Sequence, residues 1–274
     1  MSEVREPLAK LAGVLRDIGP VAVAVSGGVD SLTLATLAHR TLRGEVEMFH
    51  AVSPAVPLEA TDRVRALAAR EGWNLSVVDA GEFGDENYRS NPVNRCFYCK
   101  TNLYGALVPH TNAQIVAGTN LDDLAEYRPG LDAAKNHGVR HPFVEAGIDK
   151  KTVRAIARHL GLGDVAELPS APCLSSRIET GIAIDPDMLK LVHAAERLVT
   201  RSLAPRTVRC RVRAKGIVIE LDEQNLAALD GEARESLRNN VGSLFRDGGF
   251  EYPVSLAPYR TGSAFLVRLQ RDAA

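Results

Sequence analysis

Two cysteines stand three positions apart in a chain that has few of them. Cys96 and Cys99 lie in NPVNRCFYCK, residues 91–100, and the 274 residues include only 4 cysteines. A C-x-x-C pair can bind a metal, form a redox pair or act as a structural clip. No thioredoxin-like βαβ pattern surrounds this one, so a metal site becomes the main functional alternative to a clip.

A third thiol decides which metal the pair would suit. Cys173 lies in APCLSSR, far along the chain. Structural zinc needs four ligands, and His110 or His141 would be a forced fourth. Three thiolates instead suit an iron–sulfur cluster with one open iron, so the chemistry favours a cluster over zinc. Cys210 falls inside a predicted strand, where cysteine usually behaves as a small buried hydrophobe.

The sequence SGGVDS, residues 26–31, is the second group that could do chemistry, and it directly follows an apolar run at 21–25. Glycines let backbone N–H groups approach an anion, and a helix starting at 29 adds its positive dipole end. The Walker A pattern and its lysine are absent. The loop therefore predicts a nucleotide phosphate site of another type, in which Asp30 orients the loop or ligates Mg²⁺. Its expected residues are Ser26, Gly27, Gly28, Asp30 and Ser31.

A polar block, GTNLDD at 118–123, follows a short predicted strand at 115–117. Open α/β sheets bind ligands beyond the carboxyl ends of their strands, so Gly118 is expected beside the nucleotide. Asp122 and Asp123 could either meet Mg²⁺ or cap the next helix, and the pattern favours neither role.

Alternating strands and helices must position these residues. Their order predicts an α/β fold with a parallel sheet covered on both faces. After about residue 180 the pattern changes to a smaller α+β domain, so we predict domains at 1–180 and 181–274. Strands are predicted at 21–25, 46–52, 74–78 and 115–117, on both sides of a turn at Lys215–Gly216 in TVRCRVRAKGIVIEL, and in FEYPVSL and AFLVRL. Helices are predicted at 5–18, 29–40, 58–70, 99–108, 149–160, 186–202 and near 223–238.

The composition excludes several classes of partner. The net charge is −1 and charged residues make up 24%, so the composition does not indicate a protein that binds nucleic acid or an anionic membrane. No apolar run reaches the roughly 18 residues of a transmembrane helix. The N-terminus lacks a signal-peptide core, which predicts a cytoplasmic protein with reduced cysteines.

Taken together, the motifs resemble the LarE family of ATP-dependent sulfur transferases. These belong to the PP-loop ATP pyrophosphatases, which have an adenine nucleotide alpha hydrolase-like fold. SGGVDS indicates only this superfamily. The resemblance extends over almost the whole chain through NRCFYCK, GTNLDDLAEYRPG, GVRHPFVEAGIDK, PCLSSRI and YRTGS. The block from TNLDD to YRPG, combined with CLSSR, is the more specific part.

The resemblance implies a reaction. The family adenylates a carboxylate of pyridinium-3,5-biscarboxylic acid mononucleotide and then replaces AMP by sulfur, giving a thiocarboxylate in the synthesis of a nickel-pincer cofactor. One branch sacrifices its own cysteine at the position of Cys173. Another branch has three cysteines and carries a 4Fe–4S cluster. With Cys96, Cys99 and Cys173, this sequence is similar to the cluster branch.

The resemblance also implies residue roles and partners. The expected partners are a small nucleotide substrate, ATP, an unidentified sulfur donor and further copies of the chain, since the family forms hexamers. Neither nucleic acid nor a membrane is expected. Independent support comes from alternation, which should place Arg209, Arg211 and Arg213 on one strand face. Expected site residues are Cys173, Glu126, Ser176 and Arg177 for catalysis, with Asp122, Arg128, Arg211 and Arg213 binding nucleotide or substrate phosphate.

Some positions depart from the family pattern and leave alternatives open. ETGI follows CLSSRI where PYGE is common, and Glu126 stands where aspartate is usual. These departures concern the sulfur acceptor more than the ATP chemistry. The alternatives are a PP-loop tRNA thiolase, an ammonia-using synthetase of the same superfamily, and a nucleotide-binding sensor without catalysis.

Overall fold

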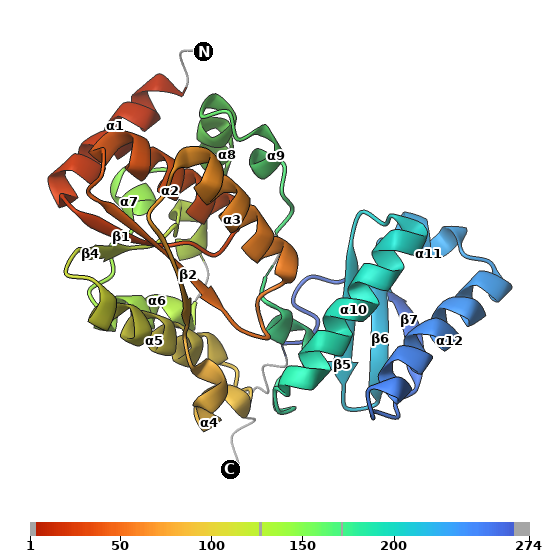
Figure 1. Cartoon of the computed structure of the whole chain (residues 1–274). Helices are drawn as coiled ribbons and strands as arrows, with labels where there is room; N and C mark the ends of the chain where they lie inside the picture. The colour runs from red at the N-terminus through yellow and green to blue at the C-terminus, as the bar shows by residue number, and fades with distance from the viewer. Residues whose placement is uncertain (1–3, 126–127, 171, 266–274) are drawn as a thin grey trace, which may run out of the picture. The chain divides into compact units, whose positions relative to one another are not determined.

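The computed structural model describes residues 4–125, 128–170 and 172–265 (Figure 1). The chain forms two compact units. The N-terminal unit comprises Met1–Glu82 and Cys96–Ala171, and the C-terminal unit comprises Phe83–Arg95 and Pro172–Ala274. Neither is continuous in sequence, because a short early segment belongs with the C-terminal unit. The division into independent domains after residue 180 stays a prediction.

A four-stranded, all-parallel sheet forms the centre of the N-terminal unit, in the order β3-β2-β1-β4. This confirms the α/β class predicted from the sequence. The central strand β1 is apolar and almost entirely buried because both of its faces are covered, whereas the edge strand β3 is largely exposed. The strands are β1 (Val21–Ala24), β2 (Val46–Val52), β3 (Leu75–Asp79) and β4 (Gln114–Val116).

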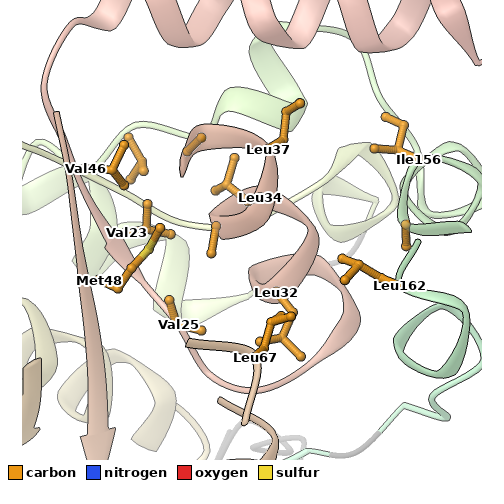
Figure 2. Close-up of a cluster of buried hydrophobic side chains, with 14 of the residues drawn as sticks. Val23, Val25, Leu32, Leu34, Leu37, Val46, Met48, Leu67, Ile156 and Leu162 are labelled. Atoms are coloured by element: carbon orange, nitrogen blue, oxygen red, sulfur yellow. The ribbon is translucent and has the colours of Figure 1, made fainter. Parts of the chain in front are cut away.

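Helices cover both faces of this sheet. One core cluster contains Val21 and Val23 of β1 and joins them to helices α1, α2, α3 and α8 (Figure 2). The neighbouring Ala22 belongs to a second cluster with α5 and α6 on the opposite face. The helices are α1 (Arg5–Ile18), α2 (Val29–Leu42), α3 (Leu58–Glu71), α5 (Arg95–Leu107), α6 (Pro129–Asn136), α7 (Pro142–Glu145), α8 (Lys150–His159) and α9 (Gly163–Ala166), with 3₁₀ helices η1 (Glu82–Gly84), η2 (Val108–His110) and η3 (Leu121–Leu124).

Most predicted boundaries agree with the structure to within about two residues. Asp149 caps α8 as expected, because its side chain accepts a hydrogen bond from the Thr152 N–H. Two helices differ more: the helical region predicted near 223–238 continues to Asp247 in α12 (Gly231–Asp247), and α5 begins at Arg95 rather than at residue 99. Cys96 therefore lies on the same helix as Cys99.

The C-terminal unit is the smaller α+β assembly predicted from the sequence. Strand β6 pairs antiparallel with β5 and parallel with β7. The turn falls one residue earlier than predicted, and Gly216 begins β6 at φ +131°, where a Cβ would lie 2.4 Å from the Pro253 carbonyl oxygen. Its elements are α4 (Glu86–Arg89), η4 (Leu174–Arg177), α10 (Pro186–Leu203), β5 (Val208–Arg213), β6 (Gly216–Leu221), α11 (Glu223–Ala228), α12 (Gly231–Asp247) and β7 (Val254–Pro258).

The end of the chain was predicted less well. Only the second half of FEYPVSL is a strand, and the strand continues to Pro258. In AFLVRL, Ala264 and Phe265 are not in a strand, and residues 266–269 lie outside the described residues. No helix in the described part of the chain is both long enough and apolar enough to cross a membrane.

Candidate active site

The SGGVDS loop connects the end of β1 to the first turn of α2. Gly27 has φ +83°, and a Cβ there would lie 2.7 Å from the Ala60 carbonyl oxygen, so only glycine fits. The Ser31 hydroxyl closes the loop by accepting from the Ser26 N–H at 3.1 Å and donating to the Gly28 carbonyl at 3.1 Å. The N–H groups at the start of this 14-residue helix are the donors that a phosphate needs.

Gly118 lies directly against this loop. A Cβ at Gly118 would be 2.9 Å from the Ser31 backbone nitrogen and 3.0 Å from the Asp30 carbonyl carbon. The contact follows from the topology, since β4 pairs with one side of β1 and β2 with the other. The strand order therefore reverses beside β1, and open α/β sheets bind ligands at such a point.

Asp30 joins three segments of the N-terminal unit. Its Oδ1 accepts a hydrogen bond from the Asn120 amide at 3.1 Å, and its Oδ2 forms an ion pair with the Lys150 ammonium. Asn120 is buried, whereas Asp30 and Lys150 are partly exposed. The result is a fixed carboxylate and a cation beside the glycine loop.

Sequence reasoning did not single out Lys150, although a signal was present. Lys150 is the first residue of α8, where the positive end of the helix dipole disfavours a cation. A lysine kept at such a position is held there by another interaction, here the Asp30 carboxylate.

Asp122 and Asp123, both predicted near the nucleotide, make different contacts. Asn120 and Asp123 form a reciprocal cap of η3, with the Asn120 N–H donating to Asp123 Oδ2 at 3.1 Å. Asp123 also pairs with Arg128 at 2.6 Å. Asp122 Oδ2 instead lies 3.4 Å from the Lys150 backbone nitrogen, on the side of the Asp30 pair. Glu126, predicted to be catalytic, lies outside the described residues.

Two residues beneath the loop were missed by sequence reasoning. His50 is fully buried; its Nδ1 lies 2.7 Å from the Val25 carbonyl oxygen and its Nε2 2.9 Å from the Thr61 hydroxyl. Burial lowers the pKa of His50, so the ring stays neutral with its proton on Nδ1. Arg63 donates to the Gly27 carbonyl oxygen at 3.2 Å and brings a positive charge to the loop, with its pKa lowered by burial. Nothing in the sequence pattern distinguishes Arg63 from other surface arginines.

Cys96 and Cys99 lie on the first turns of α5 and are half-buried. Three residues apart on a helix, they share one face, with Cβ atoms about 5–6 Å apart. This helix lies close to Gly130, where a Cβ would be 3.2 Å from Lys100 Cγ and 3.6 Å from the Cys96 carbonyl oxygen. Gly130 therefore permits the close approach of the cysteine helix.

Cys173 belongs to the C-terminal unit and is exposed at the start of η4. The three residues after Leu174 are buried, and Arg177 anchors the loop. Its guanidinium binds both carboxylate oxygens of Glu196, at 2.9 and 3.0 Å, and donates to the Pro172 carbonyl oxygen at 2.7 Å. A buried bidentate pair of this kind fixes geometry, so the loop presents Cys173 from a rigid base.

Arg211 and Arg213 meet at one carboxylate. Arg211 Nε donates to Glu220 Oε2 at 2.9 Å, and Arg213 Nη2 donates to Glu220 Oε1 at 2.8 Å. Arg211 also donates to the Ser176 carbonyl oxygen at 3.0 Å, which ties the pair to the Cys173 loop. The shared carboxylate agrees with the predicted common strand face of these two arginines. Arg209 shares the alternation of these two arginines along β5, and its guanidinium lies over the Tyr259 ring.

The cysteines show no redox pairing. All four lie within the described residues and none forms a disulfide bond. Burial raises the pKa of Cys210 well above its usual value, which keeps this thiol protonated and supports its interpretation as a core residue.

No three His, Cys, Asp or Glu side chains among the described residues lie close enough together to hold one metal ion.

Comparison with known proteins adds an independent line of information. No protein-family model matches the chain. An uncharacterized protein of Synechocystis is 35% identical over 245 residues, which cover 88% of this chain and 90% of that protein. A component of the glutamine-hydrolyzing GMP synthase of Methanopyrus kandleri is 28% identical over 206 residues, covering 67% and 64%.

A further relative carries a more specific name. The pyridinium-3,5-bisthiocarboxylic acid mononucleotide synthase of Lactiplantibacillus plantarum is 32% identical over 268 residues, covering 96% of this chain and 95% of that protein. At this coverage the match extends over both compact units. The chain therefore belongs to the family of the pyridinium-3,5-bisthiocarboxylic acid mononucleotide synthases, the LarE family that its motifs predicted.

Proposed function

We propose that this protein uses ATP to adenylate a carboxylate of pyridinium-3,5-biscarboxylic acid mononucleotide and then converts it to a thiocarboxylate, releasing AMP and pyrophosphate. The observation that carries the proposal is the glycine loop with Asp30, Asn120 and Lys150 at the strand ends, in a chain that matches a bisthiocarboxylic acid mononucleotide synthase over 96% of its residues. The ATP site lies wholly in the N-terminal unit.

The loop is suited to bind the phosphates of ATP. Backbone N–H groups at the start of α2 supply neutral donors, and Lys150 supplies a cation. When a carboxylate oxygen attacks the α-phosphorus, negative charge builds up on the phosphoryl oxygens and on the departing pyrophosphate. Fixed donors and a fixed cation at this position lower the energy of that transition state.

Asp30 also fits Mg²⁺, which we propose as the partner of ATP. An ionised carboxylate has about four lone-pair sites, so oxygen lone pairs remain after the contacts to Asn120 and Lys150 are made. Asp122, on the same side, is the second candidate ligand. Bound there, Mg²⁺ would neutralise charge on the phosphate oxygens.

Adenylation solves a specific chemical problem. A carboxylate is a poor electrophile because its oxygens carry negative charge and neither can leave easily. Transfer of AMP to one oxygen makes that oxygen part of a good leaving group. A sulfur nucleophile can then attack the carboxyl carbon, and the C–O bond to AMP breaks as the C–S bond forms.

For the sulfur source, we propose a 4Fe–4S cluster held by Cys96, Cys99 and Cys173. What supports the proposal is the chemistry of the thiols, since Cys96 and Cys99 share one helix face and Cys173 is exposed on a loop anchored by Arg177. When bound, such a cluster would pass on a sulfide that it receives from the sulfur donor. Ser176 and Arg177 hold the Cys173 loop, and we propose Arg213, a quarter exposed, as the arginine that binds the phosphate of the substrate.

We further propose that the protein works in the reducing cytoplasm as a homo-oligomer. Reduced thiols are required for the cluster, and the cytoplasm maintains them. The mass of the protein in solution, measured by light scattering, tests the oligomer and its size.

The central test combines ATP, Mg²⁺ and the biscarboxylic acid mononucleotide with anaerobically reconstituted protein. We expect pyrophosphate release and a product in which oxygen is replaced by sulfur, seen by mass spectrometry. Asp30→Ala should abolish both signals. Normal turnover by Asp30→Ala would refute the ATP site, and a salt-sensitive gel shift with tRNA together with thiolated tRNA product would favour the tRNA thiolase instead.

A further inference from the structure

A short segment before Cys96 is bound to the loop that follows Cys173. Residues 83–95 belong to the C-terminal unit, although the chain on both sides belongs to the N-terminal unit. Within the C-terminal unit, Asn91 and Tyr88 make the contacts that hold this segment. We refer to these contacts as the Asn91 clamp.

Asn91 is the centre of the clamp. Its side-chain amide donates to the carbonyl oxygens of Glu179 and Ile182, both at 2.9 Å. Its own carbonyl oxygen accepts from the Gly181 N–H at 3.0 Å, and its side-chain oxygen accepts from Arg95 at 2.5 Å. Asn91 is fully buried, so these contacts are shielded from water.

The backbone conformation of Asn91 indicates that the clamp needs its side-chain amide. Asn91 has φ +55°, in the left-handed region that glycine occupies without strain. Asparagine is one of the few other residues that tolerate this region. Glycine would fit the backbone but would leave buried carbonyl groups without their donor, which costs more than the strain.

Tyr88 adds a second attachment nearer to Cys173. Its hydroxyl lies 2.6 Å from the Ser175 hydroxyl, and both residues are almost completely buried. Ser175 is two residues after Cys173, on η4. A third contact, from the Ile184 N–H to the Arg89 carbonyl oxygen at 2.8 Å, continues the attachment along the loop.

The clamp ends where the cysteine helix begins. Arg95 is buried, binds Asn91 and lies over the Phe265 ring at 4.5 Å, and Cys96 is the next residue in the chain. One set of contacts thus fixes the chain immediately before Cys96 and immediately after Cys173. Both cysteines are ligands in the proposed function.

We propose that Tyr88 and Asn91 are positioning residues for sulfur transfer, which hold the Cys173 loop against the segment leading into Cys96. This inference rests on the proposed function for its consequence, but the clamp itself is a property of the metal-free protein. Neither residue touches ATP or the sulfur that is transferred.

The test uses two variants and two matched controls. Asn91→Gly removes the amide and keeps the left-handed backbone allowed, and Tyr88→Phe removes one hydroxyl. Ala204→Gly is the first control, because Ala204 also has positive φ in the C-terminal unit. Tyr252→Phe is the second, since Tyr252 is exposed in the same unit.

Hydrogen exchange of the metal-free proteins comes first. We expect residues 172–182 to exchange about tenfold faster in Asn91→Gly and about threefold faster in Tyr88→Phe, with β5 and β6 unchanged. After anaerobic reconstitution, both variants should lose iron, change the electron paramagnetic resonance signal and transfer sulfur more slowly. ATP affinity should stay within about twofold of the wild type, because the loop at residues 26–31 is untouched.

Two results would overturn the inference. The first is hydrogen exchange at residues 172–182 that is as slow in both variants as in the controls. The other is a loosened loop with unchanged iron content, spectrum and rate of sulfur transfer, which would leave the clamp a purely structural feature. A wild-type protein that binds no iron and transfers no sulfur would refute the proposed function instead, and hydrogen exchange would still decide whether the clamp exists.

Discussion

Gly118→Ala is the sharpest test of the ATP site, because it adds one methyl group where the segment after β4 lies directly against the glycine loop. The new Cβ would lie 2.9 Å from the Ser31 backbone nitrogen and 3.0 Å from the Asp30 carbonyl carbon. Both atoms are backbone atoms of the phosphate loop, so no flexible side chain can move aside. The loop or the segment at 118–120 must shift.

The size of the effect follows from the cost of overpacking. Inserting a methyl group into a well-packed site costs about 1–3 kcal/mol. If the loop absorbs this by moving, its N–H groups leave the positions that the phosphates need. A loss of about 1–3 kcal/mol in binding corresponds to about a 5- to 150-fold weaker affinity for ATP.

Calorimetric titration with ATP and Mg²⁺ measures the affinity, and thermal unfolding measures the stability. Gly13→Ala is the control, because Gly13 is inside α1 with nothing within 4 Å of its added Cβ. That variant should bind ATP normally and gain up to about 1 kcal/mol of stability from helix propensity. ATP affinity in Gly118→Ala equal to that of Gly13→Ala would refute the assignment of this loop as the phosphate site.

Three further predictions address charge, sulfur and pH. Lys150→Met should slow pyrophosphate release by about 100-fold, because a removed transition-state contact costs about 3 kcal/mol, whereas Lys151→Met, on the neighbouring exposed residue, should not. Cys173→Ala should keep pyrophosphate release and lose the sulfur-containing product, whereas Cys210→Ala should retain both; a sulfur product from Cys173→Ala would show that another group delivers the sulfur. Burial lowers the pKa of His50 in the folded state, so the folded protein keeps this ring neutral. Below about pH 6.5 the unfolded chain therefore binds one proton at His50 that the folded protein does not bind. The free energy of unfolding should then decrease by at most about 1.4 kcal/mol per pH unit. Urea unfolding at pH 7.5 and 5.5 should show a smaller decrease in His50→Gln, and an equal decrease would contradict this origin.

Sequence patterns predicted the parallel sheet well because each strand is a short apolar run between clear breakers. The run at 21–25 became β1, and the SGGVDS loop lies at its carboxyl end as expected. The α5 start was missed because NPVNRC has no apolar periodicity, and helices begin through local hydrogen bonds that periodicity does not report. Here the Arg95 N–H donates to the Pro92 carbonyl oxygen.

The side-chain partners were harder to predict than the loops. Asp30 was identified, but its partners Asn120 and Lys150 come from segments 90 and 120 residues away in sequence. Such pairs depend on how the elements pack, which one sequence does not reveal. The same holds for Arg211 and Arg213, whose alternation was visible although their shared carboxylate, Glu220, was not.

Several features that lower the stability of the fold lie near the carboxyl ends of β1 and β4, and their position indicates a functional site. Gly27 is forced to positive φ against Ala60, Lys150 is placed at the unfavourable end of a helix dipole, and His50 is a buried polar ring. Each feature would be cheaper to replace if stability alone were selected. All three features lie around the turn between β1 and α2. An anion bound at that turn would accept hydrogen bonds from the N–H groups of α2 and would pair with the Lys150 ammonium, which would offset part of this loss of stability. A nucleotide phosphate is the ligand whose charge and size match this arrangement.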